Sequence, residues 1–400
     1  AIGYVAGDHI TTGETNVLVG ANSGDALTTG GNNVAIGYGT LDAQTTVSGN
    51  TAVGHEGLSG NTSGTGGVAV GYRAGKANTT GNNNTAIGYT ALTANTTAAQ
   101  NTAVGSQAMI TNTTGANNTA VGMNALFANT TASNNAAIGY GAMENTTTGA
   151  DNVAFGSEAL KQNTTGANNT AIGRAALDGN TTASDNIAIG LNALGASNTS
   201  ANNVAIGSGA MGNNTSGSGV AIGKDVLGQQ TTASSNTGVG YKVLEQATTG
   251  GYNTGMGNAS LDAVTTGHTN TGIGNNCLST VTTGTGNTAL GSDAGEGVTT
   301  AADTICIGNN AGNGLIGSTS NLMYIARSNT THNNAATWIH GGTTGACYQG
   351  NNSSTWTTTS DRRIKKNIVN SSIGLEAISK LQIRNFEYKT PEEAESGEED

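Results

Sequence analysis

A glycine returns every 17 residues along most of this chain, from Gly3 to Gly308. The series holds 19 glycines, and its single irregular step is the 16 residues between Gly207 and Gly223. A fixed period kept over about 300 residues is typical of a solenoid, in which each repeat forms one coil that stacks on the coil before it. The spacing therefore predicts a long stack of coils over residues 1–308 and not a globular domain with a pocket.

The residues between the glycines are mostly small and uncharged. Aromatic residues make up 4% of the chain and charged residues 10%. Disordered linkers have a similar composition, but a linker has no need to keep a strict phase. Because the core that Ala, Val, Ile and Leu can build inside one coil is thin, burial contributes little. We therefore expect the chain to associate with other chains.

The repeat that contains Gly88 indicates how one coil is built. Alternation places Thr85 and Ile87 on one side of a short strand and the small Ala86 on the other. A second apolar pair at 91–92 predicts another short strand, and Asn-Thr-Thr at 95–97 has the chemistry of a turn. The expected fold is all-β, a parallel β-roll or β-solenoid in which each 17-residue coil has two short strands, a glycine corner and a polar loop.

The 16-residue step and the coil spacing add two expectations. The missing residue falls within the polar stretch 213–219. Loops tolerate such deletions, whereas strands in register do not, so the step supports the assignment of this stretch as a loop. At ~4.8 Å for each coil, nineteen coils would form a stack roughly 90 Å long.

The net charge of the chain limits the classes of partner that it can bind. The formal net charge is -11 at pH 7, which disfavours nucleic acid because phosphate binding requires clustered Lys and Arg. No apolar run approaches the length of a membrane span. The chain starts inside a repeat, without Met or a signal peptide. We therefore expect a fragment or processed product whose N-terminal anchor lies outside it.

No residue pattern in the chain indicates a metal ion or a cofactor. The three cysteines, Cys277, Cys306 and Cys347, are odd in number and include no CxxC spacing. They are therefore predicted to be unpaired thiols. The five histidines are scattered, and no cluster of acids, His and Cys suggests a metal centre or a catalytic triad. We expect no cofactor.

The strand element of the repeat is similar to a known bacterial motif. Residues 84–88, 101–105 and 118–122 read Asn-Thr-Ala followed by Ile or Val and Gly, which resembles the head repeat of YadA-type trimeric adhesins. The resemblance implies a left-handed parallel β-roll, with three rolls packed about a three-fold axis as a homotrimer. The repeat of that family is usually shorter, so the present coil differs by a longer loop.

The phase of the repeat is lost after Gly308, and residues 309–359 are predicted to form a short β neck or tip. This segment contains both tryptophans of the chain and a strand-like run at 321–326. Trp338 and His340 could form an exposed surface that binds a sugar or another receptor, because aromatic faces suit sugars. We favour the alternative that large side chains close the core at the tip.

The last 41 residues carry a more specific pattern. Residues 360–368 read Ser-Asp-Arg-Arg-Ile-Lys-Lys-Asn-Ile, and the similarity continues through 373–381 and 385–389. This order resembles the opening of the endosialidase-type intramolecular chaperone. Apolar spacing in 375–381 predicts a helix and alternation at 386–388 a strand. Residues 360–400 would thus be a partial α+β segment of a longer chaperone domain.

The chaperone resemblance implies a self-cleavage reaction. In that family the chaperone drives trimer assembly of a viral fibre and is then released by autoproteolysis. The resemblance places the nucleophile at Ser360, the helper base at Lys365 and the cut between Thr359 and Ser360. A serine hydroxyl needs a nearby base, and neighbouring cations can lower the pKa of a lysine. The alternative is a solvated basic patch in a domain that does not cut.

These features together predict a structural fibre. The leading hypothesis is a phage tail fibre or appendage on the virion that presents a host-attachment element to a cell-surface glycan or protein receptor. It would be anchored to the virion through its N-terminal side. The alternative is a bacterial surface or secreted adhesin filament outside the cell. The N-terminal extension would discriminate them, since one would carry a virion-binding domain and the other a signal peptide.

A polysaccharide-degrading tailspike is a further, lower-ranked alternative. Such an enzyme needs two carboxylates at a defined separation, and Asp151 and Asp185 occupy the same position of coils two apart, about 10 Å along the stack. Both stand where other coils have Asn, as at Asn168, so we predict Asn-like turn residues. Tyrosines that follow the repeat glycine are predicted to pack at the corner or between chains and not to line a receptor groove.

Overall fold

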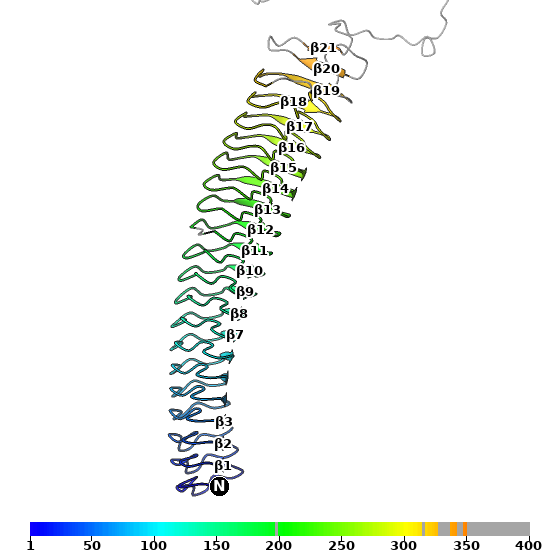
Figure 1. The fold of residues 1–400 in the computed structure, drawn as a ribbon. Coiled ribbons are helices and arrows are strands. Elements are labelled where there is room, and N and C mark those ends of the chain that lie inside the picture. The colour runs from blue at the N-terminus through cyan, green and yellow to red at the C-terminus, as the bar shows by residue number, and fades with distance from the viewer. Residues whose placement is uncertain (197–198, 314–316, 327–336, 342–346, 350–400) are drawn as a thin grey trace, which may run out of the picture. The chain divides into compact units, whose positions relative to one another are not determined.

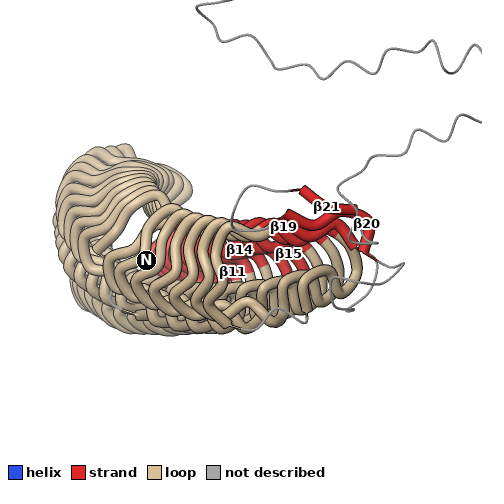
Figure 2. The backbone as a smooth tube through the Cα atoms, turned by 90° about the horizontal axis from the view of Figure 1, so that it is seen from above, coloured by secondary structure: helices blue, strands red, loops and turns tan. Residues whose placement is uncertain are grey.

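The computed structural model describes residues 1–196, 199–313, 317–326, 337–341 and 347–349, and in these segments strands and loops are the only elements. The coils stack in sequence order from the N-terminus (Figure 1). Seen along the stack, the strands form one column while loops complete each coil (Figure 2). The all-β solenoid of about 17-residue coils predicted from the glycine spacing is confirmed for this part of the chain.

Each coil contributes one short strand to a single continuous sheet. Every strand from β1 to β18 pairs in parallel with the strand of the following coil, as Thr85 of β5 does with Thr102 of β6. The strands of the coils are β1 (Val17–Val19), β2 (Val34–Ile36), β3 (Thr51–Val53), β4 (Val68–Val70), β5 (Thr85–Ile87), β6 (Thr102–Val104), β7 (Thr119–Val121), β8 (Ala136–Ile138), β9 (Val153–Phe155), β10 (Thr170–Ile172), β11 (Ile187–Ile189), β12 (Val204–Ile206), β13 (Gly219–Ile222), β14 (Asn236–Tyr241), β15 (Thr254–Asn258), β16 (Thr271–Ile273), β17 (Thr288–Leu290) and β18 (Ile305–Ile307).

The prediction of two strands in each coil is wrong, because the second apolar pair forms a turn. In the coil of Gly88, Thr90 and Leu92 both have φ of 53°, which is the left-handed region and is incompatible with a pleated strand. The Leu92 N–H still donates to the carbonyl of Ala108 in the next coil, at 3.0 Å. The coils are therefore bonded through turns as well as through strands.

The core of the solenoid consists of repeated small and branched side chains. The middle residue of each strand, such as Ala86, and the turn leucine, such as Leu92, are completely or almost completely buried. A left-handed conformation costs an L-residue roughly 1–2 kcal/mol. Burying a leucine side chain contributes about 1.5–3 kcal/mol, so the buried leucine offsets the strain of its own backbone.

Two columns of buried asparagine bind neighbouring coils. Asn84, just before a strand, accepts from the Asn101 N–H at 2.9 Å and donates to the Ala98 carbonyl at 2.7 Å, both in the next coil. In the polar turn, Asn95 donates to Asn78 Oδ1 of the previous coil at 2.8 Å and to Ala98 at 3.0 Å. The amides of Asn84 and Asn95 are both satisfied by the chain itself. The Asn-Thr-Thr stretch is thus a turn, and its asparagine is buried.

The repeat glycine forms a corner that only glycine can occupy. We call these residues the corner glycines. At Gly88 φ is 145°, a backbone conformation almost confined to glycine. A Cβ there would also lie against the carbonyl oxygen of Gly105, the corner glycine of the next coil. Both the conformation and the close approach of successive corners require glycine, which explains the strict spacing.

The 16-residue coil keeps the strand register and shortens the loop. Val204 pairs with Val220 instead of a residue 17 further on, and Ala205 and Ile206 follow in the same register. Gly219 takes the place of the buried asparagine, and its N–H donates to Asn203 Oδ1 at 3.0 Å. The prediction that the loop absorbs the deletion is therefore confirmed.

The stack extends by one strand past Gly308, the boundary predicted for the repeat. β19 (Met323–Ala326) pairs in parallel with β18, and Met323 lies opposite Ile305. β20 (Thr337–Gly341) and β21 (Cys347–Gln349) follow as antiparallel strands. The segment after Gly308 thus begins as a further coil and then changes to antiparallel pairing.

Candidate interaction surface

The residues predicted to carry chemistry are only partly covered by the structure. Thr359, Ser360 and Lys365 lie outside the described residues, so their roles stay predictions. Trp338 and His340 belong to β20 by their backbone, and their side chains lie outside the described part of the chain. The surface that the structure does describe is the outer side of the coils.

One face of the stack exposes large apolar side chains along its length, interspersed with threonine. We call it the strand face, and it consists of the two residues that flank the buried middle residue in each of β1–β18. Among the described residues, 25 large hydrophobic side chains are exposed. All but Tyr252 lie on this face, on its continuation in the first coil, or at the position after a corner glycine. Phe155, for example, is 55% exposed. Exposed patches of this extent mark interaction sites in soluble proteins.

The strand face also lacks charge. None of the strands β1–β18 contains Asp, Glu, Lys, Arg or His. Residues 1–359 as a whole carry 16 acidic against 7 basic side chains. A second acidic chain can therefore approach this face without placing like charges opposite each other.

Four rings stack on one another beside the strand face. Tyr38, His55, Tyr72 and Tyr89 follow corner glycines in successive coils, and we call them the ring ladder. Their centroids are separated in turn by 5.1, 5.2 and 5.3 Å. Sequence analysis identified the tyrosines but missed His55. Its position one residue after Gly54 was the signal that could have found it.

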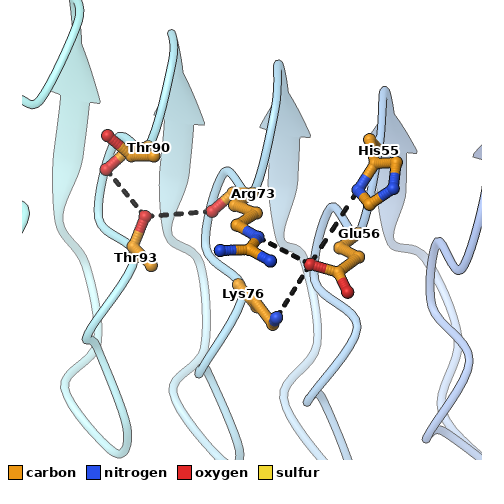
Figure 3. Close-up of polar contacts among 6 residues, drawn as sticks. All are labelled: His55, Glu56, Arg73, Lys76, Thr90 and Thr93. Atoms are coloured by element: carbon orange, nitrogen blue, oxygen red, sulfur yellow. Dashed lines mark hydrogen bonds and ion pairs between the residues drawn. The ribbon is translucent and has the colours of Figure 1, made fainter.

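A charged cluster lies next to the ring ladder and joins two neighbouring coils, those of Gly54 and Gly71 (Figure 3). Glu56 Oε2 accepts from Arg73 Nε and from Lys76 Nζ, each at 2.7 Å. The hydrogen bond from Lys76 is the main cause that lowers the pKa of Glu56, and that from Arg73 adds to it. The Arg73 guanidinium also lies 5.0 Å from the Tyr72 ring centroid. The cluster therefore holds part of the ring ladder in place.

The two carboxylates considered for a tailspike enzyme are turn residues. Asp151 and Asp185 have φ of 58° and 60°, a conformation that Asn and Asp tolerate better than most residues. Each accepts a hydrogen bond from the asparagine of the preceding coil, at 3.1 and 3.2 Å. Among the described residues, no group of three His, Cys, Asp or Glu could hold a metal ion.

The two cysteines of the stack are buried in its core. Cys277 and Cys306 are free thiols with no exposed surface. Burial raises the pKa of Cys277 to about 11 and that of Cys306 to about 12. Thiols with such pKa values carry little thiolate at neutral pH and react slowly. No helix of the described segments is long and apolar enough to cross a membrane.

One partly buried carboxylate destabilises the stack when it is ionised. Burial, followed by the nearby charge of Glu158, raises the pKa of Asp178, and Asp178 Oδ1 has no hydrogen-bond partner. Proton uptake therefore stabilises the fold below the ordinary pKa of about 3.9, and this contribution is lost as pH rises through the raised pKa.

Asp178→Asn should raise the free energy of unfolding at pH 7 by about 0.5 kcal/mol. The melting temperature should rise with it. Because the gain comes from removing a charge, it should shrink as pH falls towards the ordinary pKa of aspartate. Thermal unfolding of both chains across this pH range measures the difference. Asp185→Asn, at an exposed turn position that other coils fill with Asn, is the matched control. A constant difference at every pH would contradict the electrostatic cause.

Comparison with known proteins identifies the C-terminal segment. Residues 360–400 match the family described as chaperone of endosialidase. Neither the curated proteins nor the solved structures include a match to the chain. The similarity of this segment to the endosialidase chaperone is thereby confirmed, and the YadA-type resemblance of the coils stays a prediction.

Proposed function

We propose that this chain is the shaft of a homotrimeric phage tail fibre or appendage that presents a host-attachment element. The chaperone match and the β-solenoid together fit a structural protein of the tail-fibre type. The single observation that carries the proposal is the match of residues 360–400. The resemblance to that family implies a chaperone that assembles a viral fibre. The receptor would be a glycan or protein of the host surface.

The strand face supports association of the shaft. A solenoid with thin coils leaves many apolar side chains in water, and association removes them from it. Three copies that meet through this face would bury a continuous column on each chain. The absence of charge in β1–β18 allows this contact between chains that are acidic elsewhere.

The C-terminal segment would act once, after assembly. Ser360 Oγ would attack the carbonyl carbon of Thr359 while Lys365 accepts the hydroxyl proton and returns it to the departing amide nitrogen. Water would then hydrolyse the resulting ester, leaving a carboxylate on Thr359 and restoring the Ser360 hydroxyl. The products are the shaft and the released chaperone.

Light scattering of the intact protein tests the assembly. The wild type should have three times the mass of its chain, and the Ile138→Lys, Phe155→Lys chain should shift towards monomer because two charges per copy would be buried in the interface. Thr165→Lys, which adds charge on an exposed loop, should leave the trimer intact. A monomeric wild type, or a trimer that tolerates both strand-face lysines, would overturn the proposed assembly.

A further inference from the structure

The strand face is so regular that it does not define the position of a neighbouring copy along the axis of the stack. Its outward residues are mostly Val, Ile and Thr, as at Thr85, Ile87, Thr102 and Val104. A neighbour displaced by one coil, ~4.8 Å along the stack, would meet nearly the same side chains. Flat or uniform strands specify register weakly for this reason. Some aperiodic feature is needed to align the copies.

The ring ladder is such a feature. It occupies four successive coils at the position after the corner glycine, and that position is Ala21 in the coil before and Ser106 in the coil after. Tyr38 and Tyr89, at its two ends, are 51% and 56% exposed. The ladder is thus a run of four large rings in this column, with a small residue before it and a small residue after it.

The structure also favours a protein partner over a stacked sugar. A sugar ring packs on the face of an aromatic ring, but the faces inside the ladder are covered by the neighbouring rings at 5.1–5.3 Å. The inner rings, His55 and Tyr72, have a ring on both faces and therefore expose mainly their edges. Edges suit edge-to-face contact with other aromatic rings, and a second copy of this chain would bring the same four rings.

We propose that the ring ladder is a contact between copies of this chain and sets their axial register. The inference rests on the proposed trimeric fibre and adds how its copies are aligned. In register, the rings of each copy lie at the same height as the rings of its neighbours. A one-coil shift would set a ring of one copy against Ala21 and another against Ser106.

The charged cluster prepares the ladder for this contact. Glu56 holds Arg73 and Lys76 on the same chain, so neither cation requires a partner from another copy. Arg73 in turn lies over Tyr72. Because the side chains are already ordered, association loses less side-chain entropy than it would with free rings.

Distances between spin labels on different copies test the register. Thr97→Cys and Thr182→Cys chains, each with Cys347→Ser, are co-expressed in full length with different tags, and mixed trimers are purified. These exposed loop sites are five coils apart, ~24 Å along the stack. The wild-type ladder should give one fixed set of distances between the two labels. With Tyr38→Ser, His55→Ser, Tyr72→Ser and Tyr89→Ser, further distances from shifts of about one coil rise should appear in trimers of unchanged mass.

A matched control replaces rings that have no ring neighbour in the same column. Tyr140→Ser with Tyr241→Ser should keep the wild-type set of distances. A ladder variant that also keeps it would overturn the proposal. So would a folded ladder variant that remains monomeric, because the rings would then be needed for association and not for alignment. A monomeric wild type would instead show that the trimer itself is wrong.

Discussion

The protein should be cut after Thr359, and its Ser360→Ala variant should remain whole. Intact mass spectrometry distinguishes the two outcomes directly, because the wild type should yield a shaft fragment and a chaperone fragment. The effect should be nearly complete, since removal of a nucleophile that forms the covalent intermediate leaves no alternative path of similar rate. The family match of residues 360–400 carries this expectation.

Two further variants separate chemistry from folding. Lys365→Ala should also prevent the cut, and slow cleavage restored at higher pH would support its role as a base. Ser371→Ala, another serine in the matched segment, should be cut as the wild type is. Cleavage of the Ser360→Ala chain at the same bond would contradict the assignment of the nucleophile, whereas an uncut wild type would leave Ser360 and Lys365 as structural residues.

Gly139→Ala should destabilise the stack strongly, whereas Gly141→Ala in the same coil should have a small effect. Gly139 has φ of 136°, and a Cβ there would lie against the carbonyl oxygen of Gly156. Strain and overlap together should cost about 3 kcal/mol or more. Gly141 has φ of 60°, and Ala175 takes the same position of another coil with φ of 54°. Its substitution should cost about 1 kcal/mol.

Chemical denaturation of the wild type and of the two variants measures this difference. The paired glycines lie two residues apart, so expression, oligomer mass and solvent exposure can be compared at nearly the same site. Equal destabilisation by the two alanines would contradict the role of the corner, and so would a Gly139→Ala chain as stable as the wild type. In either case the 17-residue spacing would need another explanation.

The sequence allowed the coil and its register to be predicted, but not the path of the chain between strands. Alternation placed the small Ala86 on the side of the strand opposite Thr85 and Ile87, and in the structure that side is the core. The apolar pair ending in Leu92 indicated a strand, because nothing in a leucine signals a left-handed backbone. The signal lay elsewhere in the same column, where Gly75 and Gly295 replace the leucine with φ of 60° and 69°.

The sequence predicted that the chain would associate with other chains, but it did not predict which residues form the candidate interaction surface. A thin core led to the expectation of association, and the apolar strand face is consistent with it. The ring ladder includes a histidine, His55, stacked between two tyrosines. The tyrosine pattern alone does not predict that a histidine continues the stack. The cleavage residues follow from the resemblance of the C-terminal segment, because periodicity contains no information about a segment outside the repeat.

The amide columns have a consequence for how such a chain can change over generations. Asn95 bonds to Asn78 as Asn112 bonds to Asn95, at 2.8 and 2.9 Å, so each of these coils offers its successor the same partners that it receives from its predecessor. In-frame duplication or loss of one of these 17-residue units therefore preserves the types of bond between them. The length of the stack would therefore change in steps of one coil, ~4.8 Å each, as units are gained or lost.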